Sequence, residues 1–246
     1  MELREGIVVK SQKYQENSKI ITLVNSDGLA SFLVRAAGKL RSRNFGYSQV
    51  LTKIGYDFHQ RRNSFDILTT GKVIDSYKGI KSDINKLNDA LLILEITNQL
   101  SMHLSDFNTF YQFLDEILFL LDQNYHPYYL LIFRVKLLYL LGIGPVFSKC
   151  VLCGERDNLI GFDFLKGGMK CATCASNAGI YHNQEVIQLL RLLYLTKLED
   201  LSFELLKKLP DLTTETSAFL DRYYEHFLGF RSRASRIIKK MKISGN

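Results

Sequence analysis

The chain has 246 residues, of which 46% are hydrophobic and 23% are charged. This composition is ordinary for a globular protein, and the length permits one large domain or two modest ones. With three prolines and no repeat at a fixed period, the sequence disfavours a disordered or solenoid protein. No apolar signal segment opens the chain, and its most apolar later stretch carries Arg134 and Lys136 at its centre. A bilayer would penalise each of these by about 2.5–3.5 kcal/mol, so we expect a cytoplasmic protein with reduced thiols.

The net charge of +7 is unevenly distributed along the chain. It is +6 over residues 1–80, −5 over residues 81–228 and +6 over residues 229–246. The two terminal segments are basic and the middle of the chain is acidic. This pattern favours nucleic acid or an acidic protein as the ligand of the terminal segments. A solvated tail combined with chance would give the same pattern.

Short β-rich runs fill the first 80 residues. The turn signal Ser26-Asp27-Gly28 joins the second and third runs into a hairpin. Five short strands in this length predict a small barrel or sandwich. The expected strands lie near residues 6–10, 19–25, 29–37, 49–59 and 65–77, the last interrupted at Gly71.

After Ser82 the apolar period changes from two to about 3.6 residues, which predicts helices. We therefore predict an α+β protein with a β domain over residues 1–80 and a helical domain over residues 81–246. Residues 148–181 resemble a loop inserted into the helical domain. The expected helices span residues 83–104 with Ser82 as a cap, 109–124, 127–141, 183–197 with Asn183 as N-cap, 202–209, 216–227 with Gly229 as a stop, and a basic last helix over 232–241.

The four cysteines form two pairs, Cys150-x-x-Cys153 and Cys171-x-x-Cys174, separated by seventeen residues. Two thiolates three positions apart can point to one side of a tight turn, and two such turns supply four sulfurs to a tetrahedral ion. We expect one structural Zn²⁺, because four sulfur ligands leave no open position for catalysis. Free thiols or two disulfides are the alternatives, and a reduced cytoplasm disfavours disulfides. We expect His182 at the surface rather than as a ligand.

The densest basic stretch of the first domain follows the third expected strand. Lys and Arg bind phosphates without reading base sequence, so this stretch and a later basic loop are candidate DNA contacts. A charged hairpin tip would also explain each of them. The predicted DNA-binding residues are Arg35, Lys39, Arg41, Arg43, Arg61 and Arg62.

Two aromatic residues, Phe45 and Tyr47, follow the first basic stretch. Beside cations they could stack on unpaired bases, or they could belong to the core of the domain. The terminal segment 231–242 adds six basic residues and no acid. It is either a second electrostatic contact or a solvated tail.

Motifs of common enzymes are missing from the sequence. It contains no phosphate-binding loop, dinucleotide fingerprint, zinc-protease motif or serine-hydrolase elbow. The five histidines are scattered, and the adjacent acids Asp115 and Glu116 would face different directions on a helix. We therefore expect a protein that is not an enzyme.

Several segments together resemble the RecO family of bacterial recombination mediators. The resemblance keeps the order of elements over nearly the whole chain. It lies in residues 6–10, Tyr14 and 16–23, in 28–35, 38–39 and 42–43, in 140–145 before the first cysteine pair, and in 223–228 with 231–233.

This resemblance implies an N-terminal OB-fold barrel and a helical C-terminal domain with a zinc knuckle. It implies binding of single- and double-stranded DNA, annealing of complementary strands, and recombinase loading onto DNA coated by single-stranded-DNA-binding protein, in the bacterial nucleoid. The implied partners are RecR and the acidic tail of that coating protein, with Arg134 and Lys136 as candidate tail contacts. Where the family's basic segment carries more arginine, this chain has Arg35-Ala36-Ala37, which weakens the expected DNA affinity of this loop.

Three other functions remain open on the sequence. An RNA-binding zinc-ribbon protein of translation or transcription would prefer RNA over matched DNA through 2′-hydroxyl contacts. A nuclease built from scattered acids would cleave DNA with a divalent ion. A pure protein-interaction scaffold would retain no DNA at low salt.

Overall fold

The structure is a computed structural model that describes residues 3–175 and 180–231. Contacts between residues divide the described chain into two compact units. The first ends at Tyr125 and the second begins at His126. Within the first unit, strand gives way to helix between Asp75 and Lys78, beside the predicted domain border.

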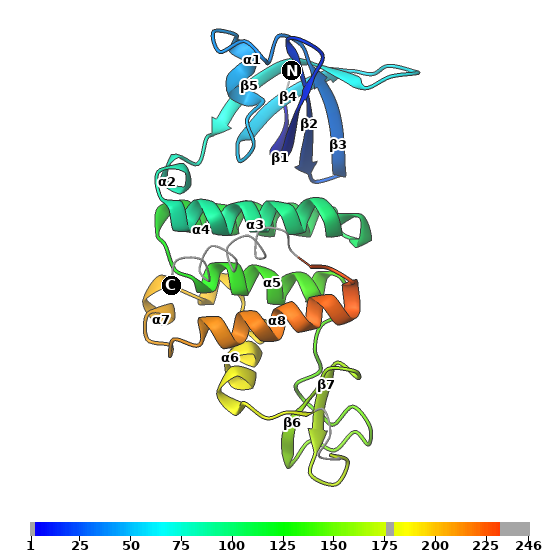
Figure 1. Ribbon diagram of the computed structural model, residues 1–246, viewed down its shortest axis with the longest axis vertical. Coiled ribbons are helices and arrows are strands. Elements are labelled where there is room, and N and C mark those ends of the chain that lie inside the picture. Colours follow the sequence, from blue (N-terminus) through cyan, green and yellow to red (C-terminus); the bar gives the residue numbers. More distant parts are fainter. Residues whose placement is uncertain (1–2, 176–179, 232–246) are drawn as a thin grey trace, which may run out of the picture. The chain divides into compact units, whose positions relative to one another are not determined.

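Five strands of the first unit close into a barrel in the order β1-β2-β3-β5-β4 (Figure 1). Neighbouring strands are antiparallel except for the parallel pair β3 and β5. This confirms the predicted five-stranded OB-like barrel. The strands are β1 (Arg4–Tyr14), β2 (Ser18–Asn25), β3 (Gly28–Val34), β4 (Lys53–His59) and β5 (Asp66–Asp75).

The hairpin between β2 and β3 forms at the predicted turn. The side-chain oxygen of Asn25 accepts hydrogen bonds from the N–H groups of Asp27 and Gly28, each at 2.9 Å. Gly28 has a φ of 137°, a value that side chains other than glycine disfavour. The barrel core is apolar and is filled from all five strands and the segment after β3, by Val8, Ile21, Leu23, Phe32, Val34, Ala37, Tyr47, Ile54, Tyr56 and Leu68.

Gly71 does not interrupt the fifth strand, so that detail of the prediction is wrong. The glycine instead provides space, because a Cβ atom there would lie 2.7 Å from the ring of Tyr47. Tyr47 belongs to a five-residue helix, α1 (Arg43–Tyr47), which the sequence did not predict. The hydroxyl of Ser42 caps this helix by accepting a hydrogen bond from the N–H of Asn44.

Among the described residues, the first unit also has three helices, α2 (Lys78–Lys81), α3 (Ile84–Leu100) and α4 (Phe107–Gln123), with the short 3₁₀ turn η1 (Ser101–His103) between the last two. Asp83, not Ser82, caps α3, because its carboxylate accepts from the N–H groups of Asn85 and Lys86. The Ser82 hydroxyl donates to the carbonyl of Gly79 instead.

The second unit packs α5 (Tyr128–Leu140), α6 (Gln184–Leu195) and α8 (Thr213–Leu228) against one another (Figure 1). Asn183 caps α6 and Gly229 ends α8 with a φ of 61°, as predicted. The short elements η2 (Leu198–Asp200) and α7 (Phe203–Leu206) connect α6 to α8.

The cysteine segment is not only loop. It contains a small sheet in the order β7-β6-β8, from β6 (Leu159–Asp163), β7 (Gly168–Cys171) and β8 (Ile180–Tyr181). The predicted basic helix over residues 232–241 lies outside the described residues. None of the described helices has the length and apolarity to cross a membrane.

Candidate nucleic-acid interface and metal centre

The basic loop after β3, residues 35–43, lies against the turn that joins β1 to β2. The N–H of Gly38 donates to the carbonyl of Asn17 at 3.1 Å, and a Cβ on Gly38 would approach that backbone at 3.2 Å. Within the loop, the N–H of Ser42 donates to the carbonyl of Lys39 at 2.9 Å. The loop is therefore held by its own backbone and by the neighbouring turn.

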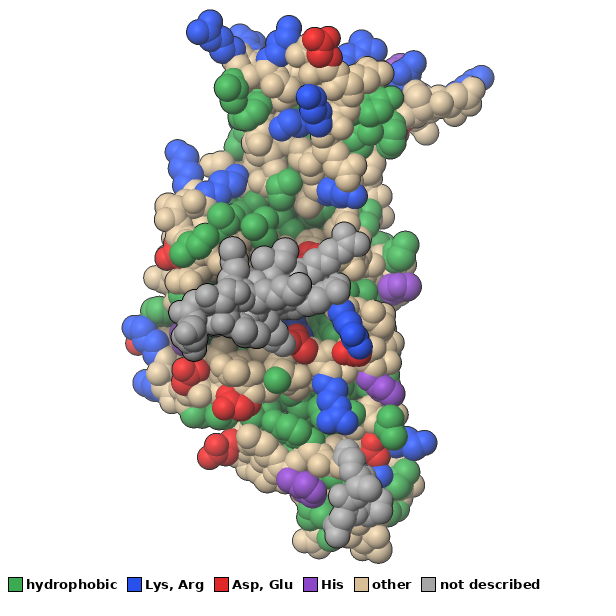
Figure 2. All heavy atoms as spheres, in the orientation of Figure 1, with side chains coloured by type: hydrophobic (Ala, Val, Ile, Leu, Met, Phe, Trp, Pro, Cys, Tyr) green, Lys and Arg blue, Asp and Glu red, His purple; other side chains and the backbone are tan. Residues whose placement is uncertain are grey.

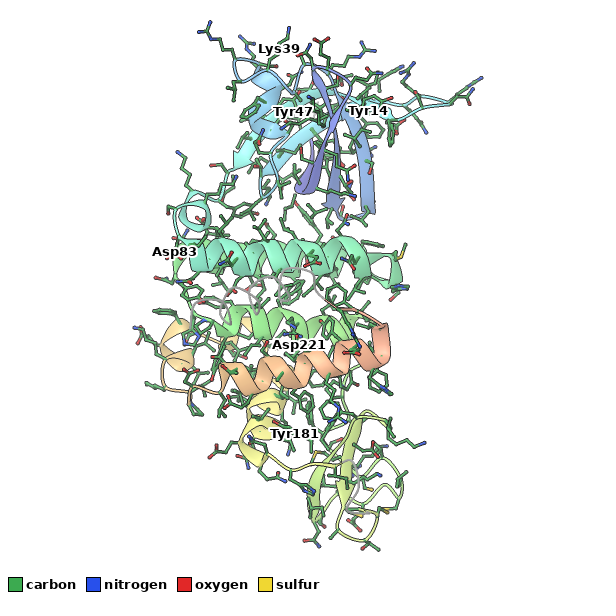
Figure 3. All side chains as sticks on the ribbon, viewed as in Figure 1. Tyr14, Lys39, Tyr47, Asp83, Tyr181 and Asp221 are labelled. Atoms are coloured by element: carbon green, nitrogen blue, oxygen red, sulfur yellow. The ribbon has the colours of Figure 1, made fainter. Side chains whose placement is uncertain are left out.

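The four predicted phosphate contacts of this loop, Arg35, Lys39, Arg41 and Arg43, are all exposed. In the described part of the chain none of them forms an ion pair. On the face shown in Figure 2, Lys and Arg side chains gather at the end of the barrel where Lys39 lies (Figure 3). These cations are thus available to an external anion.

Two lysines that the sequence analysis missed extend this charge. Lys13 on β1 lies directly opposite Lys19 on β2 in the antiparallel register. Like charges in this position repel, and an anion would relieve the repulsion. The ammonium of Lys19 lies 4.9 Å from the ring centre of Phe45, and burial lowers the pKa of Lys19. The sequence contains a signal for this pairing, because the two lysines lie at equal distances before and after the β1–β2 turn.

Arg61 and Arg62 lie on the connection between β4 and β5, and both are exposed. The N–H of Arg61 donates to the carboxylate of Asp66 at 2.8 Å, which fixes the base of this connection. All six predicted DNA-binding residues are therefore exposed on connections of one barrel. Their contact with DNA stays a prediction.

The predicted aromatic pair divides between two roles. Tyr47 is 5% exposed in the barrel core, and burial raises its pKa to about 12. Phe45 is half-buried beneath Lys19. A second aromatic pair, not singled out from the sequence, is more open. The rings of Tyr14 and Phe65 meet edge to face, with 6.4 Å between their centres.

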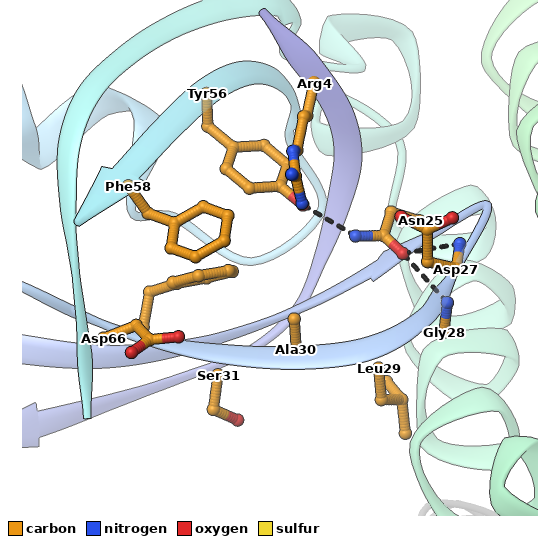
Figure 4. Close-up of a pocket in the computed structure, with 11 residues that line it drawn as sticks. Arg4, Asn25, Asp27, Gly28, Leu29, Ala30, Ser31, Tyr56, Phe58 and Asp66 are labelled. Atoms are coloured by element: carbon orange, nitrogen blue, oxygen red, sulfur yellow. Dashed lines mark hydrogen bonds between the residues drawn. The ribbon is translucent and has the colours of Figure 1, made fainter. Parts of the chain in front are cut away.

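A pocket of about 270 Å³ lies between the β2–β3 hairpin and β4 (Figure 4). The guanidinium of Arg4 lies 5.0 Å from the ring centre of Phe58 at this pocket, and the side-chain amide of Asn25 donates to the Tyr56 hydroxyl at 2.6 Å. Asp27 and Asp66 also line it. Two carboxylates beside one guanidinium make the pocket a poor receptor for a phosphate, so it is not part of the cationic interface.

The four cysteines of the second unit come together as the sequence predicts. Their sulfur atoms all lie within 4.8 Å of one another. Each pair is a tight turn: the N–H of Gly154 donates to the carbonyl of Cys150 at 2.9 Å, and the N–H of Cys174 donates to that of Cys171 at 3.1 Å. Gly154 permits the first turn with a φ of 81°. The four residues are positioned to hold a metal ion.

The electrostatics of the thiols fit a cation at their centre. Burial opposes the thiolate form of Cys150, yet hydrogen bonds from the backbone at Cys153 and Cys171 lower its pKa to about 6. The neighbouring sulfurs, Cys153 first, raise the pKa of Cys174 to about 12. Four thiolates at this spacing repel one another until a metal dication neutralises them. The ring of His182 is exposed, as expected from the sequence, and faces the carbonyl of Ile160.

The two candidate contacts for an acidic partner, Arg134 and Lys136, are held inside the second unit. The guanidinium of Arg134 is 2.8 Å from the carboxylate of Asp221 and also donates to Ser217. The ammonium of Lys136 donates to the carbonyl of Thr196 at 2.5 Å, and burial lowers the pKa of Lys136. Both cations therefore bind groups of their own unit, and a role in partner binding stays a prediction.

Asp115, one of the two adjacent acids on α4, is held by contacts within the first unit. Asp115 accepts hydrogen bonds from Lys53 and from the hydroxyl of Tyr77. These contacts join α4 to the barrel and to the segment that leaves it. They give Asp115 a structural role.

Two family models and several known proteins match nearly the whole chain. The family model described as "Recombination protein O N terminal" matches residues 1–77, and "Recombination protein O C terminal" matches residues 81–236. A DNA repair protein RecO of Listeria monocytogenes serotype 4a is 28% identical over 249 residues, covering 98% of this chain and 95% of the relative. The proteins of the same name from Halalkalibacterium halodurans and Bacillus mycoides are 25% and 28% identical, covering 98% and 96% of this chain and 95% and 96% of their own length.

Proposed function

The chain belongs to the recombination protein O family, and from this premise we propose that it binds DNA as a non-enzymatic mediator of recombinational repair. In this proposal it binds single and double strands, anneals complementary strands and assists recombinase loading onto DNA coated by single-stranded-DNA-binding protein. The observation that carries the proposal is the set of exposed cations on the connections at one end of the barrel.

The mechanism needs only electrostatics and positioning. Each phosphate that a Lys or Arg neutralises releases counterions, which makes binding favourable at low salt. When two complementary strands lie on the same cationic surface, their mutual repulsion falls and pairing proceeds. No bond is made or broken in this scheme, and no side chain of the interface acts as an acid or base.

The metal centre and the partners belong to the second unit in this proposal. One Zn²⁺ held by Cys150, Cys153, Cys171 and Cys174 would brace the small sheet, and its four sulfur ligands leave no position for substrate. We propose RecR and the acidic tail of single-stranded-DNA-binding protein as partners. Arg134 and Lys136 already bind groups of their own unit, so an acidic partner would have to replace those contacts.

The salt dependence of DNA affinity tests the proposal. A variant with Arg35, Lys39, Arg41 and Arg43 all changed to Ala should bind single strands with a shallower slope of log affinity against log salt. The slope should fall by about 0.7 for each phosphate contact that is lost. The matched control changes four exposed cations of the second unit, Arg191, Lys197, Lys207 and Lys208, to Ala and removes the same charge.

The slope of the control should stay near that of the unchanged protein. An equal loss in both variants would mean that only net charge matters, and an unchanged slope in the loop variant would remove the loop from the interface. Tighter binding of a matched RNA oligonucleotide would favour the RNA-binding alternative instead.

Annealing is tested separately. Complementary strands precoated with the cognate single-stranded-DNA-binding protein, with or without its acidic tail, should pair faster with the unchanged chain than without it. The loop variant should lose most of this acceleration. A dependence on the acidic tail would support that tail as a partner.

A further inference from the structure

Phe65 is an exposed aromatic residue in a cationic setting. Its side chain is 45% exposed at the end of the β4–β5 connection, which extends away from the barrel (Figure 1). The ring of Tyr14 supports it edge to face, at an interplanar angle of 71°. Tyr14 is the last residue of β1, so this contact ties the connection to the barrel.

Basic residues lie near this pair in the sequence of both chain segments. Lys13 precedes Tyr14, while Arg61 and Arg62 precede Phe65, and all three are exposed. Glu16 and Asp66 are the nearby acids in the sequence, and the carboxylate of Asp66 accepts the N–H of Arg61. An exposed ring among cations suits a ligand that combines flat apolar faces with negative charges.

We propose that Phe65, supported by Tyr14, stacks on bases of an unpaired DNA strand while Arg61 and Arg62 on the same connection bind its phosphates. This inference rests on the proposed function and deepens it. Bases inside a duplex are already stacked on their neighbours, so only an unpaired strand can use the Phe65 ring. The cations of the interface do not distinguish strands in this way, and the aromatic pair therefore adds a preference for unpaired DNA.

A purely structural role for the pair also fits the geometry. The two rings would then form a hydrophobic clip that holds the β4–β5 connection against β1 and touches no ligand. The two interpretations differ in what can replace the ring. A clip tolerates any apolar side chain of similar size, whereas a stacking surface requires an aromatic ring.

The first experiment uses the absence of tryptophan from the chain. Phe65→Trp introduces a single tryptophan, whose fluorescence should be quenched on titration with a single-stranded oligonucleotide and should change far less with the matching duplex. The matched control is Phe119→Trp on α4, where the native phenylalanine is 53% exposed. Its fluorescence should respond to neither DNA, while anisotropy of labelled DNA reports binding by both variants.

The second experiment compares affinities of Phe65→Leu, Phe65→Tyr and the unchanged chain. Phe65→Leu should weaken single-strand binding about tenfold, which corresponds to about 1.4 kcal/mol, and should leave duplex binding and the salt slope unchanged. Phe65→Tyr should retain single-strand affinity. Arg61→Ala combined with Arg62→Ala should weaken both kinds of DNA and reduce the salt slope.

The outcomes separate the inference from the function beneath it. If the unchanged chain binds single strands and Phe65→Leu binds them equally well with an unchanged melting temperature, the stacking inference is overturned and the clip remains. Fluorescence of the Phe65→Trp variant that does not respond to a bound single strand would overturn it too. If the unchanged chain retains no oligonucleotide even in dilute buffer, the proposed function fails as well.

Discussion

Lys53 on β4 and Asp115 on α4 form an ion pair with 2.8 Å between Nζ and Oδ2. Only 17% of the lysine side chain and 31% of the aspartate side chain are exposed. Burial by itself would lower the pKa of Lys53, but Asp115 and Glu5 outweigh this effect and raise the pKa. The ammonium therefore stays charged, and it joins the barrel to a helix of the same unit.

Replacing Lys53 should destabilise the first unit. Lys53→Met keeps the aliphatic stem but removes the ammonium that donates to the carboxylate of Asp115. The hydrogen bond from the Tyr77 hydroxyl to that carboxylate, at 3.2 Å, stays. Leaving a partly buried charge without its partner costs about 1–3 kcal/mol of unfolding free energy. Urea unfolding followed by far-ultraviolet circular dichroism measures this loss.

The matched control is Lys197→Met. Lys197 pairs with Glu199 while both side chains are mostly exposed, at 77% and 69%. An exposed pair of this kind contributes less than about 1 kcal/mol. Similar losses in the two variants would contradict the importance of burial for the Lys53 pair.

A methyl group at Gly71 should disturb the barrel where α1 is anchored. The added Cβ would lie 2.7 Å from three ring atoms of Tyr47, and that ring is fixed in the core. Overpacking of this kind costs about 1–3 kcal/mol. Gly71→Ala should therefore lower the midpoint of thermal and urea unfolding.

Gly46→Ala is the matched control for Gly71→Ala, because both glycines lie where α1 meets β5. The nearest heavy atom to a Cβ at position 46 is a Val73 methyl carbon at 3.9 Å, an ordinary contact. Gly46 lies within α1, where alanine is favoured over glycine by about 0.5–1 kcal/mol. Gly46→Ala should thus be neutral or stabilising, and a loss there equal to that of Gly71→Ala would rule out the steric explanation.

Periodicity and turn chemistry predicted five strands of a small barrel or sandwich, the major helices and the cysteine cluster, and the RecO resemblance selected the barrel. Asn183 and Gly229 were identified correctly because a cap acts on its own few residues. The cysteine pairs were identifiable because their spacing alone places two sulfurs at one turn. These features depend on neighbours in the sequence.

What the sequence did not show depends on contacts between distant residues. Gly71 was expected to break a strand, but its role is set by Tyr47, which lies on another element. The Lys13–Lys19 pair follows from strand register, and the Tyr14–Phe65 contact joins residues about fifty positions apart. Arg134 and Lys136 stood out in an apolar stretch, yet only the structure reveals Asp221 and the Thr196 carbonyl as their partners.

Asp89 should make the stability of the first unit depend on pH. Burial raises the pKa of Asp89 to about 7 from an unfolded value of 3.8, and a hydrogen bond with Tyr125 only partly opposes this. Between these two values the folded state binds more protons than the unfolded state, so stability falls as pH rises. Asp89→Asn removes this dependence and should gain stability relative to the unchanged chain from about pH 4 to about pH 8.

Asp106 provides the opposite sign in the same measurement. Hydrogen bonds from the hydroxyl and the backbone of Thr109 lower the pKa of this exposed N-cap. Its contribution is present above the unfolded pKa of 3.8 and is lost as pH falls through the folded value. In urea unfolding over a pH series, Asp106→Asn should lower the free energy of unfolding near neutral pH and have no effect in acid. If the free energies of unfolding of Asp106→Asn and Asp89→Asn change with pH in the same way, the assigned burial of Asp89 is contradicted.

The proposed metal site and DNA interface predict that metal removal destabilises the second unit and leaves DNA retention intact. Metal analysis of the purified chain should find about one Zn²⁺, and Cys153→Ser should abolish it. Cys153 is the exposed member of the cluster, so this change removes a ligand with little loss of packing.

A chelator should lower the unfolding temperature of the unchanged chain and should not lower that of Cys153→Ser further. Because thiolates must lose protons to bind metal, release should become easier as pH falls. A metal-free chain that unfolds at the same temperature would show that the cysteine cluster is not a structural metal site.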